Sequence, residues 1–279
     1  MSSTIILCPQ PPASSLLWAI NAAGKIFNVT VSGDVTEENL PVGWVAERIS
    51  ASLNGYVWVI ASDISRTKYA ILCKRVKETT WSYVIPLQAS AEITQSKFGL
   101  WILSKDHLTL VDIDGNTRCS HRLVIKASDV CESVDGSLWL IGGKVRHGGW
   151  SIQRLPPGND HWFEFPEPVA TVRVSCAPDG TAWATNSKGQ VWRIHPDGPG
   201  HFTECGQHAS CRKCLKSPAT QNIILVSVGA DGQVWGLSNK QVPDGNQIIR
   251  LIIGTKMIVE LPQSIGAVHI AASTMAAEL

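Results

Sequence analysis

A tryptophan that follows a glycine turn recurs about every 40 residues, and this repeat constrains the fold more than any other feature. It appears in segments such as "SLNGYVWVIASD" and "GADGQVWGLSNK", centred on Trp18, Trp58, Trp101, Trp139, Trp183 and Trp235. The separations between successive tryptophans are 40, 43, 38, 44 and 52 residues. In five of the segments a glycine lies two or three residues before the tryptophan, at Gly55, Gly99, Gly136, Gly180 and Gly232. The chain therefore contains six equivalent units.

Each unit is typical of a two-stranded β-hairpin. Segments such as "RVSCAPDGTAWAT" alternate apolar and polar residues with period two, and the Asp-Gly pair supplies the positive φ angles of a tight turn. Helical repeats of the same length need apolar residues at i, i+3 and i+4, and no segment of ten residues shows this pattern. Short strands repeated about every 40 residues predict an all-β fold, a six-bladed β-propeller with four-stranded antiparallel blades.

The two ends of the chain are expected to complete one blade together. The Trp18 unit begins with the strand that follows the turn, whereas "GAVHIAAS", residues 266–273, resembles the strand that precedes it. Pairing of these segments would close the ring and remove its exposed edges. We therefore expect a single domain over residues 14–273, with tails at 1–13 and 274–279 and an insertion at about 199–218.

Composition excludes several classes of function. A net charge of +1 and a pI of 7.6 argue against nucleic-acid binding, which requires a basic surface. No apolar stretch is long enough to span a membrane. The start, "MSSTIILCPQPPASS", lacks the basic region of a signal peptide, so we expect a cytoplasmic protein, with non-classical release left open. We accordingly predict thiols or ligands for the eight cysteines, with Cys73, Cys131 and Cys176 as small core residues.

The repeat resembles the tectonin repeat. The segment "ILVSVGADGQVWGLSN" is a close match, and "LLWAINAAGKIFNVT" and "VRVSCAPDGTAWATNSKGQVWRI" are good ones. The resemblance covers roughly residues 14–273 and implies a propeller used for recognition. Tectonin-type propellers include lectins that bind bacterial lipopolysaccharide or methylated sugars, and intracellular domains that make protein contacts in vesicle trafficking and autophagy.

The eleven tryptophans comprise the six of the hairpins, four candidates for ligand binding, and Trp192, which stands where the tectonin pattern has a tyrosine. Those of the six hairpins occupy equivalent positions, so we expect them to fill the spaces between blades. Trp81 and Trp162 lie on expected outer strands, while Trp44 and Trp150 fall outside the hairpin position. These four are our candidates for ligand binding, although a packing role is the alternative for each. Trp150 follows two glycines in "RHGGWS", which is typical of a loop tip.

A cysteine-rich segment lies within the 52-residue spacing. In "HFTECGQHASCRKCLK", Cys205, His208, Cys211 and Cys214 follow the spacing C-x2-H-x2-C-x2-C. Three cysteines and a histidine are a known ligand set for structural zinc, and a metal would order an insertion that has no core of its own. The basic residues between Cys211 and Cys214 point instead to a redox or disulfide pair. Inert thiols are the third interpretation.

No catalytic motif accompanies the repeat. Phosphate-binding glycine loops, G-x-S-x-G elbows and H-E-x-x-H helices are absent from the sequence. We therefore predict a non-enzymatic recognition module that needs no cofactor. The first hypothesis is a lectin that binds a glycan in pockets between blades or on the loop face. The alternative is a scaffold for a protein partner, as an adaptor in trafficking or autophagy or as a subunit of a larger assembly.

Overall fold

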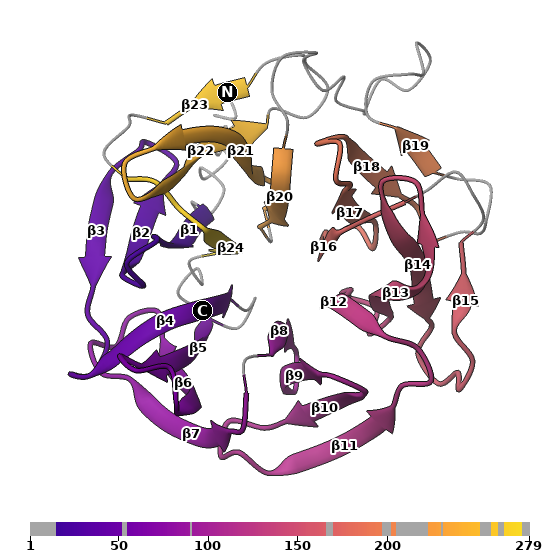
Figure 1. The fold of residues 1–279 in the computed structure, drawn as a ribbon, viewed down its shortest axis with the longest axis horizontal. Coiled ribbons are helices and arrows are strands. Elements are labelled where there is room, and N and C mark those ends of the chain that lie inside the picture. The colour runs from indigo at the N-terminus through magenta and orange to yellow at the C-terminus, as the bar shows by residue number, and fades with distance from the viewer. Residues whose placement is uncertain are drawn as a thin grey trace, which may run out of the picture.

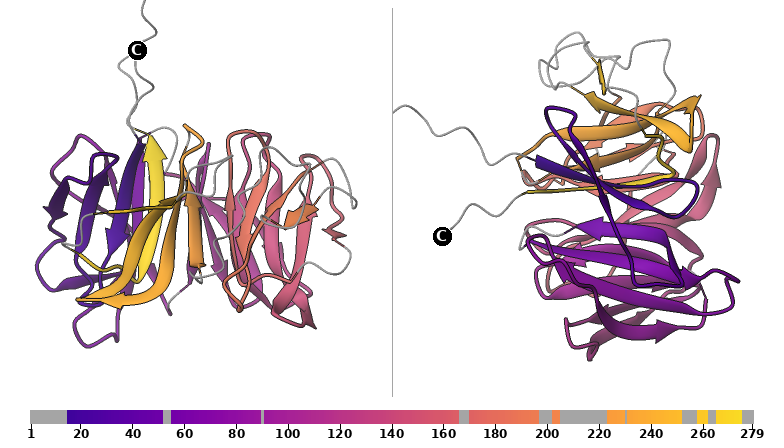
Figure 2. Two further views of the ribbon diagram at one scale, coloured as in Figure 1. Left: turned by 90° about the horizontal axis from the view of Figure 1, so that it is seen from above. Right: turned by 90° about the vertical axis from the view of Figure 1, so that its left-hand side faces the viewer.

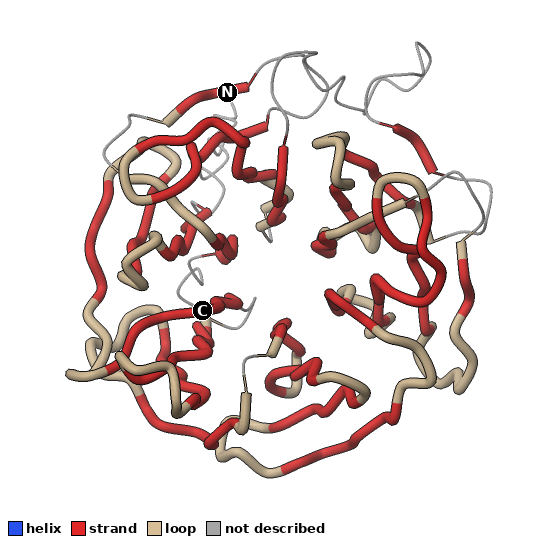
Figure 3. Tube along the Cα trace, in the orientation of Figure 1, coloured by secondary structure: helices blue, strands red, loops and turns tan. Residues whose placement is uncertain are grey.

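Every regular element in the described part of the chain is a β-strand. The computed structural model describes residues 15–51, 55–89, 91–165, 170–196, 202–204, 223–229, 231–251, 258–261 and 265–274, and these ranges contain no helix (Figure 3). Consequently, they contain no helix that could cross a membrane.

The strands form six four-stranded antiparallel sheets arranged around a common centre (Figure 1). Residues of the six innermost strands line a cavity there, in what we call the central channel. From the channel outwards, blade 1 is β24-β1-β2-β3, and blades 2 to 6 follow in chain order as β4–β7, β8–β11, β12–β15, β16–β19 and β20–β23. The predicted six-bladed propeller is thus confirmed. The strands are β1 (Ser15–Ile20), β2 (Ile26–Thr30), β3 (Val35–Glu38), β4 (Trp44–Ala51), β5 (Tyr56–Asp63), β6 (Tyr69–Arg75), β7 (Ser82–Leu87), β8 (Glu92–Ser96), β9 (Gly99–Ser104), β10 (His107–Val111), β11 (Thr117–Arg122), β12 (Ala127–Glu132), β13 (Leu138–Arg146), β14 (Gly149–Leu155), β15 (Phe163–Glu164), β16 (Arg173–Cys176), β17 (Ala182–Thr185), β18 (Val191–Ile194), β19 (Phe202–Glu204), β20 (Ile223–Val228), β21 (Val234–Val242), β22 (Gly245–Leu251), β23 (Ile258–Glu260) and β24 (His269–Thr274).

The ring closes as the sequence predicts. Strand β24 from the end of the chain pairs antiparallel with β1, and Trp18 lies opposite Ala271 in this pair. The first strand of blade 1 therefore comes from the C-terminal end of the domain and its other three strands from the N-terminal end (Figure 1). Because this pairing holds the two ends together, the sheets have no open edge at the point of closure.

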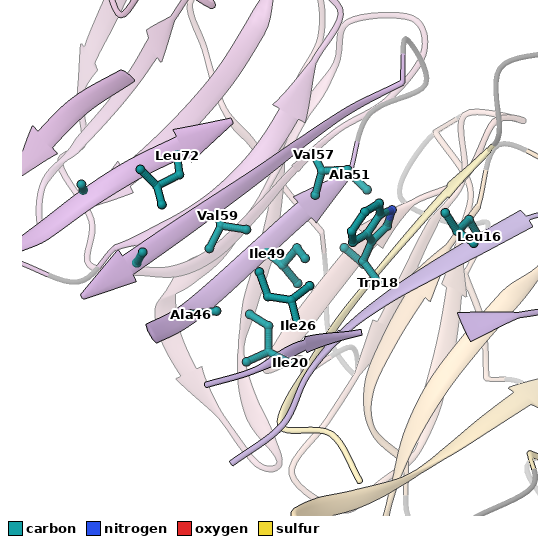
Figure 4. Packing of buried hydrophobic residues seen from close by; sticks show 13 residues of the cluster. Leu16, Trp18, Ile20, Ile26, Ala46, Ile49, Ala51, Val57, Val59 and Leu72 are labelled. Carbon is teal, nitrogen blue, oxygen red and sulfur yellow. The ribbon is translucent and has the colours of Figure 1, made fainter. Parts of the chain in front are cut away.

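The core consists of six hydrophobic clusters, one at each interface between consecutive blades. Each cluster contains one hairpin tryptophan. Figure 4 shows the cluster between blades 1 and 2, where Trp18 lies among aliphatic side chains such as Ile26, Ile49 and Val57. All six hairpin tryptophans are buried, so their predicted role as wedges between blades is confirmed.

The Asp-Gly turns stabilise these tryptophans. In blade 4, Gly136 adopts a φ of 84°, and the carboxylate of Asp135 accepts a hydrogen bond from the backbone N–H of Ser137 (2.9 Å). The same carboxylate accepts a hydrogen bond from Nη2 of Arg154 (3.0 Å), and this guanidinium lies 5.6 Å from the ring of Trp139. Blade 5 repeats the arrangement with Asp179, Arg193 and Trp183. The recurring Asp thus orients the arginine that covers the tryptophan.

The disc has two faces, and the side views in Figure 2 show the strands running from one to the other. In blades 2 to 6 the first strand connects to the second at one face of the disc, which we call the turn face. The opposite face, where each first strand begins, is the start face. The second and third strands are longer in alternate blades, with seven to nine residues in blades 2, 4 and 6 and four to six in blades 1, 3 and 5.

The expectation for two of the cysteines is wrong. Cys131 in β12 and Cys176 in β16 form a disulfide that joins the first strands of blades 4 and 5, with Cα atoms 5.8 Å apart. The prediction of core thiols depends on the apparent lack of a signal peptide and on the position of these cysteines in expected strands, neither of which shows that the two strands lie side by side. Cys73 remains a free, buried thiol, and burial raises its pKa to about 12.

Candidate functional site

Four of the exposed apolar side chains lie on the turn face of blades 2, 3 and 4. Phe98 is 65% exposed, Tyr83 57%, Val134 53% and Ile113 44%. Each lies at a turn or at the first residues of a strand on that face: Tyr83 in β7, Phe98 in the β8–β9 turn, Ile113 in the β10–β11 turn and Val134 in the β12–β13 turn. We call these four residues the turn-face surface. Two pockets accompany it.

The β8–β9 turn directs Phe98 away from the core. The Oγ atom of Ser96 accepts a hydrogen bond from the backbone N–H of Phe98 (3.2 Å). Gly99 follows with a φ of 148°, and a Cβ atom there would lie 2.0 Å from the carbonyl oxygen of Val111, so only glycine fits. The ammonium group of Lys97 lies 4.9 Å from the centre of the Phe98 ring. The tight turn thus presents an aromatic ring and a positive charge together.

The β10–β11 turn positions Ile113 in the same way. The Oδ1 atom of Asp112 accepts hydrogen bonds from the backbone N–H groups of Asp114 (3.0 Å) and Asn116 (2.8 Å). Burial alone would raise the pKa of Asp112, but hydrogen bonds from Asn116 and the charge of Arg118 lower it below its usual range. The carboxylate therefore stabilises the turn.

The first pocket is an open groove of about 620 Å³ between the outer parts of blades 2 and 3. Its lining includes Tyr56, Arg75, Tyr83 and Ile113. Nε of Arg75 donates a hydrogen bond to the hydroxyl of Tyr56 (3.0 Å), and its guanidinium lies 5.3 Å from the centre of the same ring. The groove therefore combines two tyrosines, one of them already covered by an arginine, with an exposed isoleucine.

The second pocket, of about 200 Å³, lies at the mouth of the central channel. Val134 and Pro178 contribute apolar surface to it, and Lys97 and Glu132 contribute polar groups. The indole N–H of Trp101 donates a hydrogen bond to Glu132, and burial raises the pKa of this carboxyl group. The mouth pocket and the outer groove thus lie on the same face, at the inner and outer ends of the turn-face surface.

A third pocket on this face, also about 200 Å³, lies between blades 5 and 6. Its lining includes Trp183 and Arg193. Trp183 is only 1% exposed and the guanidinium of Arg193 lies 5.6 Å from its ring. The pocket therefore offers no free indole face on which a sugar could stack.

The four tryptophans predicted to bind a ligand do not converge. Trp44 and Trp81 pack against the cluster between blades 1 and 2, Trp150 against that between blades 4 and 5, and Trp162 against that between blades 3 and 4. All four are half-buried, and none lines the three pockets described above. Their role in ligand binding stays a prediction.

The predicted metal ligands Cys205, His208, Cys211 and Cys214 lie outside the described residues, as does most of the insertion around them. Within the ranges that the structure does describe, no group of three or more His, Cys, Asp or Glu side chains could hold a metal ion. The zinc, redox and inert-thiol interpretations of the cysteine-rich segment all stay predictions.

Sequence reasoning missed the turn-face surface, although one signal for it was present. Phe98 stands directly before Gly99, the position that Asn54, Asp135, Asp179 and Asp231 hold in the other units. An apolar side chain in place of a turn-forming Asn or Asp is unfavourable for a solvated turn unless something covers it. Phe98 is therefore an exposed aromatic residue that a comparison of the repeats could have identified.

No protein-family model matches the chain, and no curated protein matches it. Solved propellers of other types do match it along most of its length. They include YCF48 bound to a D1 peptide (12% identity, TM-score 0.52, covering 92% of this chain and 85% of that one) and TolB from Acinetobacter baumannii (12%, 0.65, 93% and 66%). An oligogalacturonate lyase in complex with manganese also matches (12%, 0.55, 89% and 74%). At these identities the likeness establishes that the chain shares the β-propeller fold, and nothing more specific.

Proposed function

We propose that the protein is a non-enzymatic interaction module that binds a protein partner on the turn face of blades 2 to 4. The observation that carries this proposal is the turn-face surface itself: four exposed apolar side chains, two of them aromatic, lie on one face of three consecutive blades beside two pockets.

The burial of these residues would favour association. Exposed apolar side chains are ordinary when they are scattered, but a group of them on one face with pockets beside it is typical of a recognition site. Aromatic residues and arginine are also enriched where partners meet, because they bury a large area at a small entropic cost. Tyr83, Phe98 and Arg75 supply these side chains, whereas the fold itself is stabilised by the interfaces between blades.

A protein partner agrees better with this surface than a glycan does. A lectin with the same pocket in every blade gains avidity by binding several sugars at once, but the turn-face surface is confined to three of the six blades. The rings of Tyr56 and Trp183, which line pockets, are each approached by an arginine of the same blade. The lectin hypothesis therefore rests on the tectonin resemblance alone, while that resemblance is equally compatible with protein contacts.

The solved relatives add support at the level of fold. YCF48, whose propeller resembles this one, was solved with a bound D1 peptide. A shared fold does not transfer a ligand, and a peptidase and a lyase are also among the similar structures. The choice of a non-enzymatic module therefore depends on the exposed surface and on the absence of catalytic motifs from the sequence.

Paired substitutions test the proposal. Phe98→Asp and Val134→Asp place a charge on the turn face, and Val42→Asp and Val124→Asp place the same charge at the most exposed valines of the start face. Each protein is immobilised and partners are captured from the native source. A stoichiometric partner that Val42→Asp and Val124→Asp retain, and that Phe98→Asp and Val134→Asp lose, supports the proposal. A glycan-array signal lost in the same two turn-face variants would favour a lectin instead.

A further inference from the structure

The start-face end of the central channel carries a ring of ionisable residues. In each first strand one residue lies opposite the hairpin tryptophan, as Ser50 lies opposite Trp58. The residue two positions before it occupies an equivalent place in all six blades. In blades 1 to 6 these ring residues are His269, Arg48, Glu92, Asp129, Arg173 and Leu225.

Glu92 forms ion pairs with both arginines of this ring. Nε of Arg48, from the neighbouring blade 2, lies 3.0 Å from both of its carboxylate oxygens. Nη1 of Arg173, from blade 5, lies 3.2 Å from Oε1 of Glu92. Because blades 3 and 5 are not neighbours, the second ion pair extends beyond a single blade interface. Two guanidinium groups therefore share one carboxylate.

The ring has more hydrogen-bond donors than acceptors. The two guanidinium groups hold ten N–H groups between them, of which Arg48 uses one for Glu92 and one for the carbonyl of Glu47, and Arg173 uses one for Glu92. Asp129 is a poor acceptor for the remaining N–H groups, because its two oxygens already accept hydrogen bonds from the backbone N–H groups of Val130 (2.9 Å) and Val174 (2.8 Å). Among the described residues the other N–H groups have no acceptor, and the side chains of Arg48 and Arg173 are 29% and 30% exposed. Arg173 also lines the cavity in the channel.

The histidine adds an unpartnered polar atom at the same place. Nδ1 of His269 is buried and has no hydrogen-bond partner in the described structure. Burial lowers the pKa of His269 to about 3, and the charges of Arg48 and Arg173 act in the same direction. Burial also raises the pKa of Asp129 to about 7. The ring thus combines two guanidinium groups with the carboxyl groups of Glu92 and Asp129.

The fold alone does not require these charges. Leu225 occupies the equivalent position in blade 6, where it is buried against apolar neighbours. Ion pairs in a partly buried channel cost desolvation energy, and apolar side chains of similar size often stabilise a protein better. A ligand would account for a ring that keeps its charges in four blades.

We propose that this ring binds a small carboxylate anion inside the central channel. A cavity of about 80 Å³ adjoins the ring, and Glu92, Asp129, Arg173 and His269 line it. This volume is several times the 10–15 Å³ or so that one water molecule needs. It therefore has room for a carboxylate of two or three carbon atoms. Its oxygens accept from the remaining N–H groups of Arg173, whose planar guanidinium suits a carboxylate, and His269 donates from Nδ1. The site is separate from the turn-face surface and does not depend on the proposed function.

Thermal unfolding with sodium acetate, against sodium chloride at equal ionic strength, tests the proposal. The wild type is expected to show a saturable rise in Tm with acetate beyond that with chloride. Arg173→Met and His269→Leu are expected to weaken the apparent affinity at least tenfold. The matched control is Arg122→Met, which removes the same charge from an exposed position in β11.

His269→Leu decides the question even if Arg173→Met fails to fold, because it places at this ring position the residue that blade 6 already has. Retention of the acetate effect in Arg122→Met together with its loss in His269→Leu supports the site. Equal acetate effects in His269→Leu and the wild type, or no effect beyond that of chloride in the wild type, would overturn it.

Discussion

Cys131 of blade 4 is bonded to Cys176 of blade 5 at the place where serine side chains join three other pairs of blades. In each case the contact is made by the residue that lies opposite the hairpin tryptophan of one blade. Its partner in the next blade is the residue that follows the one opposite that blade's own hairpin tryptophan. The serine contacts are hydrogen bonds from Gln95 N–H to Ser50 Oγ (2.9 Å), from Val228 N–H to Ser175 Oγ (3.1 Å) and from Ala272 N–H to Ser227 Oγ (2.9 Å). The disulfide is thus a covalent form of a contact that the repeat already provides.

This equivalence predicts that serine will replace Cys131 better than alanine. Removal of the disulfide should cost about 2–4 kcal/mol, because the bond closes a long loop in the unfolded chain. Cys131→Ser/Cys176→Ala retains an acceptor for the backbone N–H of residue 176, whereas Cys131→Ala/Cys176→Ala does not. The serine variant should therefore be more stable by about 1 kcal/mol in urea unfolding. Equal stabilities would show that the serine contact does not form at this interface.

The hairpin tryptophans should matter far more for stability than the half-buried ones. Trp139 is fully buried, donates its indole N–H to Ser133 Oγ (2.8 Å) and lies 5.2 Å from the ring of Phe165. Trp139→Ala is expected to lower the free energy of unfolding by about 3–5 kcal/mol, because it leaves a cavity between blades. Trp162→Ala should cost less than half as much. Denaturant unfolding of both variants measures this, and a similar loss for the two would contradict the wedge role.

His269 predicts a specific dependence of stability on pH. Its pKa is about 3 in the folded state and about 6.5 when the chain is unfolded, so below pH 6.5 the unfolded state gains a proton that the folded state does not bind. This group therefore destabilises the fold increasingly as the pH falls from 6.5 towards 3. His269→Leu removes the effect. Relative to the wild type, the variant should gain about 2 kcal/mol in the free energy of unfolding between pH 7.5 and pH 5.

Asp129 acts in the opposite direction in the same range, because its folded pKa of about 7 lies above its unfolded value. Its contribution is largest at low pH and declines as the pH rises towards 7, and it is present in both the wild type and His269→Leu. The comparison of these two proteins therefore isolates His269. A constant difference in stability between pH 7.5 and pH 5 would show that His269 has the same pKa in the folded and unfolded states.

The ion pairs around Glu92 should be costly to break singly but not together. Glu92→Leu leaves Arg48 and Arg173 without their shared carboxylate and is expected to lower the free energy of unfolding by about 3–5 kcal/mol. The triple variant Glu92→Leu/Arg48→Met/Arg173→Met removes all three charges. It should recover most of this loss, as measured by thermal and urea unfolding. A triple variant less stable than the single one would mean that each charge contributes on its own.

The repeat was sufficient to predict the number of blades and the closure of the ring. The hairpin at each tryptophan is a local feature, and "GAVHIAAS" could be paired with the Trp18 unit because only one strand was lacking. The two-blade alternation in strand length was harder to recognise. Strands β13 and β21 are long because each continues past a register shift in its pairing with the third strand of its blade. No single residue type marks such a shift.

The sites depend on geometry that the sequence does not contain. Arg173 and Glu92 lie 81 residues apart, and their contact requires that first strands of different blades share one channel. Cys131 and Cys176 pair because the residue opposite the hairpin tryptophan in one blade contacts a residue of the next blade that lies one place further along its first strand. Phe98 is different, since its replacement of a turn Asp is visible in an alignment of the repeats. The six hairpin tryptophans are buried between blades, whereas the binding role predicted for Trp44, Trp81, Trp150 and Trp162 stays a prediction.

The most direct test of the account is a binding titration of the turn face. The partner recovered by capture is purified and its dissociation constant is measured for the wild type, Phe98→Asp and Val124→Asp by isothermal titration calorimetry. We predict that Phe98→Asp weakens binding at least tenfold while Val124→Asp leaves it within about twofold. The reason is that only Phe98 belongs to the turn-face surface, which is proposed to contact the partner. Equal affinity of Phe98→Asp and the wild type, or the reverse order of the two variants, would contradict the account.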